Sequence, residues 1–108
     1  CALVTNKPRD VTLLVLERLG IQDALPVVWG GGDGRLKPAP DGVLAVCAAL
    51  GVAPSGAWMI GDGPQDVLAG RAAGAFTVAV PGIAARDVLL AARPDLVVES
   101  LSELPALV

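Results

Sequence analysis

Residues 57–74 read Ala57-Trp-Met-Ile-Gly-Asp-Gly-Pro-Gln-Asp66 and continue as Val67-Leu-Ala-Gly-Arg-Ala-Ala-Gly74. The apolar beginning, residues 57–61, predicts a buried β-strand, because a short apolar run bounded by a turn signal is typical of one. Residues 63–73 predict a helix that ends at Gly74. This segment therefore combines a strand, a loop and a helix, and it places Asp62 and Asp66 where the strand meets the helix.

The same succession of strand, loop and helix recurs in both directions from this segment. The expected strands are residues 1–5, 26–30, 75–80 and 96–98, and the expected helices are residues 8–19, 40–50, 84–92 and 101–107. Strands that alternate with helices form parallel sheets through right-handed crossovers, so the sequence predicts an α/β fold. We expect one Rossmann-like parallel sheet with helices on both faces, because its strands are apolar throughout.

Helical spacing also predicts how the helices begin and which side chains they bury. Asn6 can cap the first helix, and Asp62 with Gln65 has the spacing of a capping box for the third. The apolar positions expected on buried faces are Val11, Leu14, Val15 and Leu19 in the first helix and Val43, Leu44, Cys47 and Leu50 in the second.

Composition excludes several classes of protein. The chain has 108 residues, the size of one small domain, and 54% of them are hydrophobic, which excludes intrinsic disorder. Eight basic against eleven acidic residues give a net charge of −3, so no basic surface for nucleic acid is expected. No apolar run approaches the roughly 20 residues of a membrane span. Histidine is absent, which excludes imidazole bases and ligands, and two cysteines make no disulfide framework, which indicates a cytoplasmic protein.

Polar side chains that can bind a ligand follow the first three strands. Thr5 and Asn6 follow the first, Lys37 lies in the loop after the second, and Asp62 and Asp66 follow the third. In an open parallel sheet these positions share the edge where ligands bind, and nearby helix N-termini favour an anion there. Carboxylates suit Mg²⁺, and a lysine supplies a point charge for phosphoryl oxygens. The group therefore fits a phosphate with a hard cation.

Each of these residues also has a purely structural interpretation. Thr5, Asn6 and Asp62 are residue types that cap helices, and Lys37 is typical of a solvated loop charge. The glycine-rich loop at 30–34 lacks the ending of a P-loop. A dinucleotide-binding site is a further possibility for Gly61-Asp-Gly-Pro-Gln-Asp66. It is weakened because Asp66 stands where such a motif has its third glycine.

The order of three motifs resembles the haloacid dehalogenase (HAD) superfamily, and within it the phosphoglycolate-phosphatase-like branch. The motifs are Ala2-Leu-Val-Thr-Asn-Lys-Pro8, Lys37-Pro-Ala-Pro-Asp41, and Met59-Ile-Gly-Asp-Gly-Pro-Gln-Asp66 leading into Ala69-Gly-Arg-Ala-Ala-Gly74. The resemblance implies a Mg²⁺-dependent phosphomonoester hydrolase that acts on a small phosphorylated metabolite. It extends over essentially the whole chain.

The resemblance also implies a role for each candidate residue. Thr5 would bind the transferring phosphoryl group, with Asn6 beside it, and Lys37 would neutralise phosphoryl charge and orient the nucleophile. Asp62 would ligate Mg²⁺, and Asp66 would support either the metal or Lys37. The family usually has serine after the first acid, where this chain has Gly63.

One departure from the family changes the expected activity. The family's first motif, Asp-x-Asp-x-Thr, supplies the nucleophile and the general acid/base, and this chain contains no Asp-x-Asp. The cap domain between the first and second motifs is missing too. Residues 1–108 therefore resemble only the part of the core domain that follows the cap domain, and we expect no phosphatase activity from them alone.

The missing motif also removes a central strand. In the family this strand lies between the first and third strands of this chain, which must therefore pair directly or leave a gap that another molecule fills. We expect self-association, or complementation by a missing segment, because open strand edges invite pairing. The alternative function is non-catalytic: a split or degenerate HAD-like domain that binds a phosphorylated ligand or a partner chain.

Overall fold

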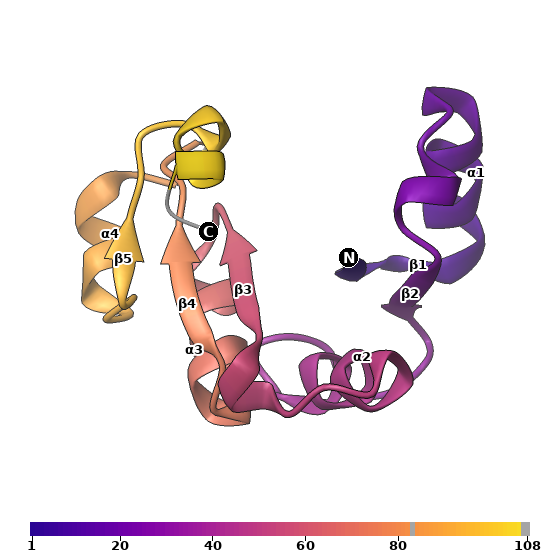
Figure 1. The fold of residues 1–108 in the computed structure, drawn as a ribbon, viewed down its shortest axis with the longest axis horizontal. Coiled ribbons are helices and arrows are strands. Elements are labelled where there is room, and N and C mark those ends of the chain that lie inside the picture. The colour runs from indigo at the N-terminus through magenta and orange to yellow at the C-terminus, as the bar shows by residue number, and fades with distance from the viewer. Residues whose placement is uncertain (83, 107–108) are drawn as a thin grey trace.

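The computed structural model describes residues 1–82 and 84–106 and contains alternating strands and helices (Figure 1). The strands are β1 (Ala2–Pro8), β2 (Val27–Gly31), β3 (Trp58–Gly61), β4 (Phe76–Ala79) and β5 (Leu96–Val97). The helices are α1 (Arg9–Leu19), α2 (Asp41–Leu50), α3 (Pro64–Ala73) and α4 (Arg86–Ala91). Short 3₁₀ segments occur at Gln22–Ala24, Pro54–Gly56 and Leu101–Ala106. The predicted last helix is thus a 3₁₀ segment, and its expected end at residue 107 lies outside the described residues.

The strands form two parallel sheets, where the sequence predicted one. β1 pairs with β2, and β4 pairs with β3 and β5. Among the described residues no pairing joins β1 to β3, so the two sheets stand apart with α2 running between them (Figure 1). The α/β class and parallel strands are confirmed, and of the two outcomes expected for a missing central strand, the gap is the one observed.

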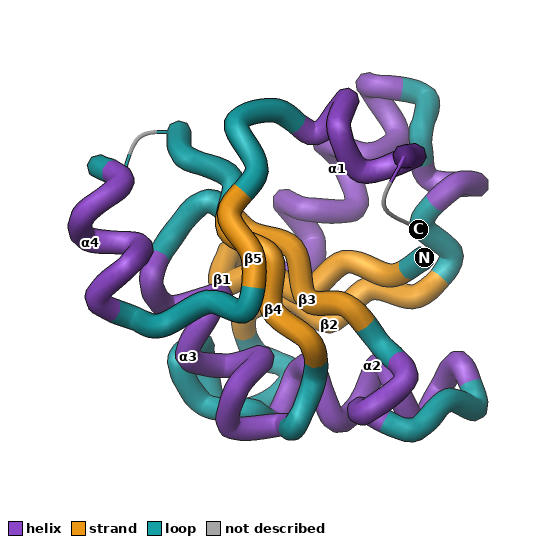
Figure 2. Tube along the Cα trace, turned by 60° about the vertical axis from the view of Figure 1, so that its left-hand side comes forward, coloured by secondary structure: helices purple, strands orange, loops and turns teal. Residues whose placement is uncertain are grey.

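The helices cover the sheets unequally. α1 and α2 lie on opposite sides of the β1–β2 pair (Figure 2). On the second sheet, Thr77 and Met59 face α3 closely, since a Cβ at Gly70 would lie 2.7 Å from Thr77 Cγ2. The other face of β3 and β4 is more open, with Trp58, Ile60 and Phe76 each more than a third exposed. Helices therefore lie on both sides of the first sheet, while much of one face of the second remains solvent-accessible.

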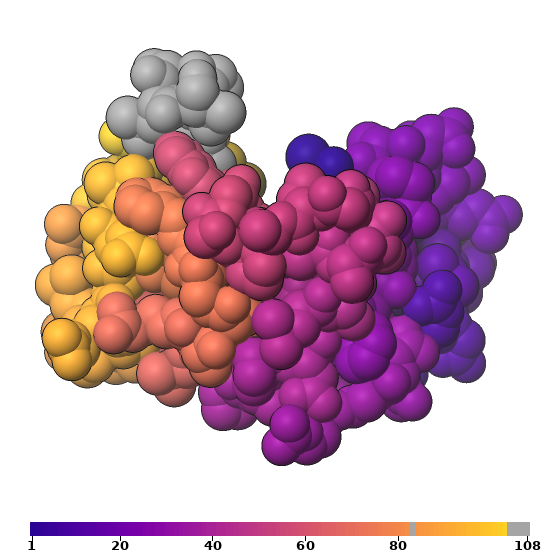
Figure 3. Space-filling view, turned by 60° about the horizontal axis from the view of Figure 1, so that its bottom comes forward, coloured from indigo at the N-terminus to yellow at the C-terminus, as the bar shows by residue number. Residues whose placement is uncertain are grey.

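Two small clusters of buried residues form the core. The first brings together α2, α3 and the residue before β4, and the second lies between α3, β4 and α4. Their members are Val43, Cys47, Ala69 and Ala75 in the first and Val67, Ala79, Leu89 and Ala92 in the second. Because α2 and α3 share the first cluster, their packed side chains join the two sheets, which we call half-sheets from here on. The space-filling surface is continuous across this region (Figure 3).

The expected helix ends are confirmed where glycine marks them. Helices α1, α2 and α3 end at Gly20, Gly51 and Gly74, whose φ angles of 71°, 71° and 87° lie in the left-handed region. Glycine adopts this conformation without the steric cost of a Cβ atom, so these residues stop the helices where the sequence predicted. None of the helices in the described part of the chain has the length and apolar character needed to cross a membrane.

The predicted buried face of α1 is wrong. Val11, Leu14, Val15 and Leu19 are 41–65% exposed, and the helix instead buries Thr12 and Leu16 against the sheet. The Thr12 hydroxyl donates to the carbonyl of Pro8 at 3.0 Å, which satisfies a polar group at a buried position. In α2 the prediction is half right, because Val43 and Cys47 are buried while Leu44 and Leu50 are exposed. Helical spacing identifies apolar positions but does not reveal which of them a neighbouring element covers.

A carboxylate holds β5 on the sheet. Asp95 accepts hydrogen bonds from the main-chain N–H of Thr77 at 2.8 Å and from its hydroxyl at 3.0 Å. The main-chain N–H of Asp95 donates in turn to the Thr77 hydroxyl oxygen at 3.0 Å. These hydrogen bonds, the main-chain one above all, lower the pKa of Asp95, and the nearby charge of Arg71 contributes least. The turn before β5 is thus tied to a side chain of β4 that is fully buried.

Candidate functional site

The ammonium group of Lys37 connects the two half-sheets. Its Nζ atom lies 2.5 Å from Oδ1 of Asp66 and 3.0 Å from the carbonyl oxygen of Val4. Val4 belongs to β1 and Asp66 to the first turn of α3, which follows β3. The two charged side chains are only 11% and 7% exposed. Lys37 is therefore not a solvated loop charge, which was its structural interpretation from the sequence. It is paired with Asp66 at the carboxyl edge of the sheets.

Asp66 also completes the start of α3. Its second oxygen, Oδ2, accepts the main-chain N–H of Gly63 at 3.1 Å, and Gly63 is the residue that caps the helix. The predicted capping role of Asp62 is therefore wrong, because the helix begins one residue later than that interpretation requires. A carboxylate at the third helical position that bonds back to the cap residue is half of a capping box. Asp66 thus has both oxygens engaged, one by an ammonium group and one by a peptide N–H.

Close packing makes Gly61 part of this arrangement. A Cβ atom at Gly61 would lie 2.3 Å from Cβ and from Oδ2 of Asp66. Real side-chain atoms do not approach so closely, so only glycine at the end of β3 lets the carboxyl group reach Lys37. A glycine directly before the loop was a sequence signal that another group approaches closely there. The sequence did not show that this group is the Asp66 carboxylate.

A break in strand pairing sets the positions of Thr5 and Asn6. The pairing of β1 with β2 shifts between Val4 and Pro8, which is a bulge next to the site. The Thr5 hydroxyl oxygen accepts the main-chain N–H of Lys7 at 3.2 Å, so its own hydrogen can be donated elsewhere. Asn6 does not cap α1, where Pro8 takes that position; its carboxamide bonds instead to the main chain of Lys37.

Asp62 follows β3 and borders a cavity of about 370 Å³. The cavity lies between the ends of β3 and β4, and Gly61, Val80, Pro81 and Gly82 contribute to its wall. A Cβ at Gly82 would lie 3.5 Å from Oδ2 of Asp62, an ordinary contact distance. The Asp62 side chain is exposed, so its carboxylate is accessible to a ligand at the edge of the sheet.

Of the predicted site residues, Lys37 is in direct contact with Asp66 and with Asn6, although these residues lie in or follow strands of two sheets. Lys37 contacts Asp66 directly; Thr5 is the chain neighbour of Val4, and Asp62 is the chain neighbour of Gly63. Two other charged residues, Asp33 and Arg35, lie in the loop after β2 with Lys37, and each is paired with a nearby group. Asp33 accepts the N–H of Gly30 and pairs with Arg9, and these bonds lower its pKa. Arg35 pairs with Asp41.

The donor set has the chemistry of a magnesium site. The candidate ligands are carboxylate oxygens, and no histidine occurs in the chain. Within residues 1–82 and 84–106, no three Cys, Asp or Glu side chains gather into a closed cage. Mg²⁺ is usually held by one or two carboxylates, waters and substrate phosphate, so Asp62, open to solvent and beside a cavity, fits such an ion.

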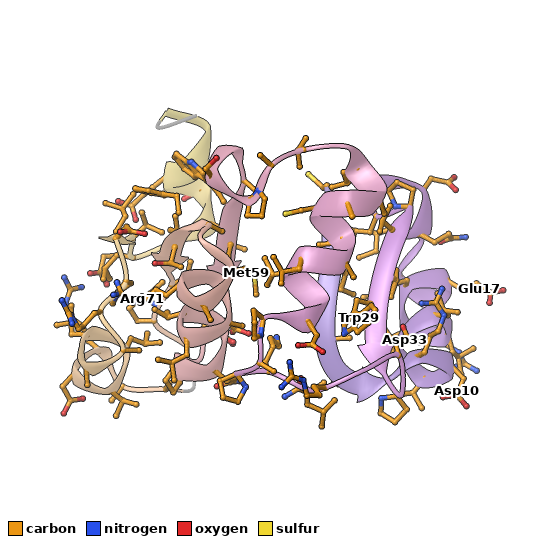
Figure 4. The ribbon with its side chains drawn as sticks, turned by 90° about the horizontal axis from the view of Figure 1, so that it is seen from below. Asp10, Glu17, Trp29, Asp33, Met59 and Arg71 are labelled. Atoms are coloured by element: carbon orange, nitrogen blue, oxygen red, sulfur yellow. The ribbon has the colours of Figure 1, made fainter. Side chains whose placement is uncertain are left out.

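An apolar groove separates β1 from β3. Its volume is about 360 Å³, and its walls include Leu3 and Val4 of β1, Val43 and Cys47 of α2, and Met59 and Ile60 of β3. Figure 4 shows Met59 on the half-sheet across from Trp29 and Asp33. In the described residues β1 pairs only with β2 and β3 only with β4, so each strand presents one open edge to the groove.

Comparisons with known proteins agree with the resemblance to the haloacid dehalogenase superfamily. Phosphoglycolate phosphatase of Escherichia coli K12 is 37% identical over 108 residues, which are 97% of this chain and 43% of that protein. A HAD family hydrolase from Deinococcus radiodurans, solved with bound phosphate and sodium, superposes with a TM-score of 0.86 at 29% identity over 98% of this chain and 50% of that one. A predicted phosphoglycolate phosphatase from Haemophilus somnus gives a TM-score of 0.89 at 25% identity, covering 98% of this chain and 48% of that one.

The comparisons also fix how far the likeness extends. The chain spans 43% of the length of the curated relatives it matches and about half of the solved structures. The family model for haloacid dehalogenase-like hydrolases matches residues 1–80, which include every candidate site residue. The chain therefore belongs to the haloacid dehalogenase-like hydrolase family.

Proposed function

We propose that residues 1–108 form the phosphate- and Mg²⁺-binding part of a phosphomonoester hydrolase core, the part that follows the cap domain. The observation that carries this proposal is the position of Lys37. Its ammonium group is held between β1 and α3 by the carbonyl oxygen of Val4, which precedes Thr5, and by the carboxylate of Asp66. A structural role alone does not require an almost buried ammonium group at the carboxyl edge of the sheets, where the sequence also places a hydroxyl and a second carboxylate.

Lys37 is placed to neutralise charge on a phosphoryl group. An ammonium group has three hydrogens, and the carbonyl of Val4 and the carboxylate of Asp66 accept two of them. The third can be donated to a phosphoryl oxygen. Because the side chain is only 11% exposed, its charge acts in a medium less polar than water, where a preorganised donor stabilises developing negative charge more strongly. Thr5 can donate its hydroxyl hydrogen to the same group.

Asp62 is the residue we assign to Mg²⁺. Its carboxylate is open to solvent, whereas both oxygens of Asp66 are engaged by Lys37 and Gly63. We therefore propose that Asp66 acts on the metal site through position and charge, and that its main role is to hold Lys37. When bound, Mg²⁺ supplies charge neutralisation at the phosphoryl oxygens.

The nucleophile must come from a segment that fills the groove between β1 and β3. β1 pairs in parallel with β2 and β3 pairs in parallel with β4, and β1 and β3 each present an open edge to the groove, so a strand inserted there would have an edge available for pairing. We propose that this strand carries the family's Asp-x-Asp-x-Thr motif and that its first aspartate attacks the phosphorus atom. The phosphoglycolate phosphatases among the relatives favour a small phosphomonoester as substrate. The cytoplasmic location remains a prediction from composition.

Joining the chain to the missing segment tests this function. The part of the E. coli relative that lies outside the match can be placed before Cys1, and hydrolysis of p-nitrophenyl phosphate measured with and without Mg²⁺. We expect Mg²⁺-dependent turnover that Lys37→Ala or Asp62→Asn reduces by about 10² or more, while Arg35→Ala, at an exposed pair in the same loop, leaves it unchanged. Turnover that both site variants leave intact would overturn the proposal.

A non-catalytic function is the second candidate, and the absence of Asp-x-Asp from residues 1–108 favours it. The same joined protein separates the two. Binding of orthophosphate with Mg²⁺, lost in Lys37→Ala but accompanied by no turnover in a folded protein, would assign ligand binding without hydrolysis.

A further inference from the structure

The side chain of Asn6 binds the main chain of Lys37 through both of its polar atoms. Oδ1 of Asn6 accepts the main-chain N–H of Lys37 at 2.9 Å, and Nδ2 donates to the Lys37 carbonyl oxygen at 3.2 Å. These bonds connect residues that are 31 positions apart in the sequence. A carboxamide has one acceptor and one donor group in the same spacing as a peptide, so it can hold one residue at both ends.

Strand β1 therefore holds Lys37 at two points, its main chain and its ammonium group. Asn6 fixes its main chain, and the carbonyl of Val4, two residues earlier in β1, accepts its ammonium group. The bulge between Val4 and Pro8 makes this geometry available, because an unpaired stretch of β1 is free to bond with the loop instead of with β2. Arg35, in the same loop, pairs with Asp41 at the start of α2 and so holds another part of the loop, and the main chain of Lys37 itself is bonded by Asn6.

We propose that Asn6 is a positioning residue whose carboxamide sets the place of the Lys37 ammonium group. The proposal deepens the function assigned above, because it rests on Lys37 being the phosphoryl-binding cation. Its physical basis is that the main chain of Lys37 engages Oδ1 and one of the two Nδ2 hydrogens of the Asn6 carboxamide.

Selective acetylation can test this without any activity. The chain contains two lysines, Lys7 and Lys37, and Lys7 is exposed whereas the Lys37 side chain is 11% exposed. Acetic anhydride at fixed pH, followed by mass spectrometry of peptides, gives the two rates within one sample. Lys7 is the internal standard, and we expect Lys37 to react much more slowly in the unaltered chain.

The variant Asn6→Ala removes both bonds to the loop. We expect the rate of Lys37 acetylation relative to Lys7 to rise about tenfold, which corresponds to about 1.4 kcal/mol in the local opening of the loop. Asn6→Asp keeps an acceptor for the Lys37 N–H but cannot donate to its carbonyl, so an intermediate rise is expected. Circular dichroism establishes that each variant is folded under the conditions of labelling.

A destabilised control separates positioning from general loosening. Val67→Ala removes a side chain that is 1% exposed and packs in the second core cluster. If Val67→Ala raises the Lys37 rate as much as Asn6→Ala at equal loss of unfolding free energy, or if Asn6→Ala leaves the rate unchanged, the proposal is wrong. Because labelling needs no substrate, a failure of hydrolysis in the joined protein would reject the proposed function and leave this role of Asn6 intact.

Discussion

Lys37 and Asp66 form an ion pair of 2.5 Å that joins the loop after β2 to the helix after β3. Lys37 follows a strand of one half-sheet and Asp66 follows a strand of the other. The described residues show no strand pairing between the two half-sheets. The pair thus contributes a polar connection across the groove, alongside the apolar packing of α2 on α3. The ion pair that positions the Lys37 charge is therefore also a contact that holds the two half-sheets together.

Removal of one partner should destabilise the chain strongly. Lys37→Ala leaves the Asp66 carboxylate, 7% exposed, without its ammonium partner, and we expect the free energy of unfolding in urea to fall by about 3 kcal/mol. Arg35→Ala breaks an ion pair whose arginine is 77% exposed, and a change below about 1 kcal/mol is expected there. Equal losses in the two variants would show that the Lys37 pair behaves as an ordinary surface pair.

The space at Gly61 gives a second prediction about the same carboxylate. Gly61→Ala would place a methyl group 2.3 Å from Asp66, whose oxygens are bonded to Lys37 and Gly63 and cannot move without cost. We expect a loss of about 2 kcal/mol in unfolding free energy. Gly56→Ala is the matched control, because a Cβ there meets no atom within 4 Å, and it should change stability by less than about 0.5 kcal/mol. Similar values for the two variants would contradict the observed packing.

The chain alone should not hydrolyse phosphomonoesters. It lacks an Asp-x-Asp nucleophile motif, and loss of an essential nucleophile removes several orders of magnitude in rate. A steady-state assay of residues 1–108 with p-nitrophenyl phosphate and Mg²⁺ should give no turnover above the blank. Robust turnover that Asp62→Asn abolishes would show that this chain contains a nucleophile of its own.

Acid should release β5 through Asp95. Hydrogen bonds from Thr77 lower the pKa of Asp95 in the folded chain, so the stabilisation is complete above the unfolded value of about 3.9 and is lost as pH falls through the folded value. Denaturation at a series of pH values should therefore show Asp95→Asn to be less stable at pH 7 and less sensitive to pH below about 4.

The control for this pH dependence is Asp23→Asn, which removes an exposed carboxylate from the 3₁₀ segment after α1. It should retain the acid sensitivity of the unaltered chain. An Asp95→Asn profile parallel to that of the unaltered chain would mean that the Thr77 contacts do not favour the ionised form.

The sequence predicted the elements of this fold well because their signals are local. Glycines at positions 20, 51 and 74 end helices through their own conformational freedom, and apolar runs mark the strands. The contact of Lys37 with Asp66 was also expected in outline, since parallel strands bring the residues after them to one edge, while the placement of Thr5 and Asp62 in the same site stays a prediction. These inferences need no knowledge of which side chains touch.

The errors concern contacts between segments far apart in the chain. Asn6 has the chemistry of a helix cap, and only the fold shows that its partner is Lys37, 31 residues away. Asp62 and Asp66 both suit the start of α3, and a difference of one residue in where the helix begins decides between them. The exposed side of α1 was misassigned because an apolar face is buried only where another element covers it.

The groove between β1 and β3 should make the isolated chain associate. Two open strand edges border it, and exposed Trp58, Ile60 and Phe76 lie on the adjoining sheet. Unpaired edges next to apolar surface favour pairing with another chain, so light scattering after size exclusion should give a mass above 10.8 kDa that rises with concentration.

A charge in the groove provides the matched test of that association. Leu3→Lys places an ammonium group on the wall that β1 contributes, and a charged edge opposes strand pairing. We expect this variant to shift the mass towards the monomer, whereas Leu19→Lys, at a 65% exposed position at the end of α1, should not. A concentration-independent monomer for the unaltered chain would mean that the open edges are stable in water, and the groove would then need no second polypeptide.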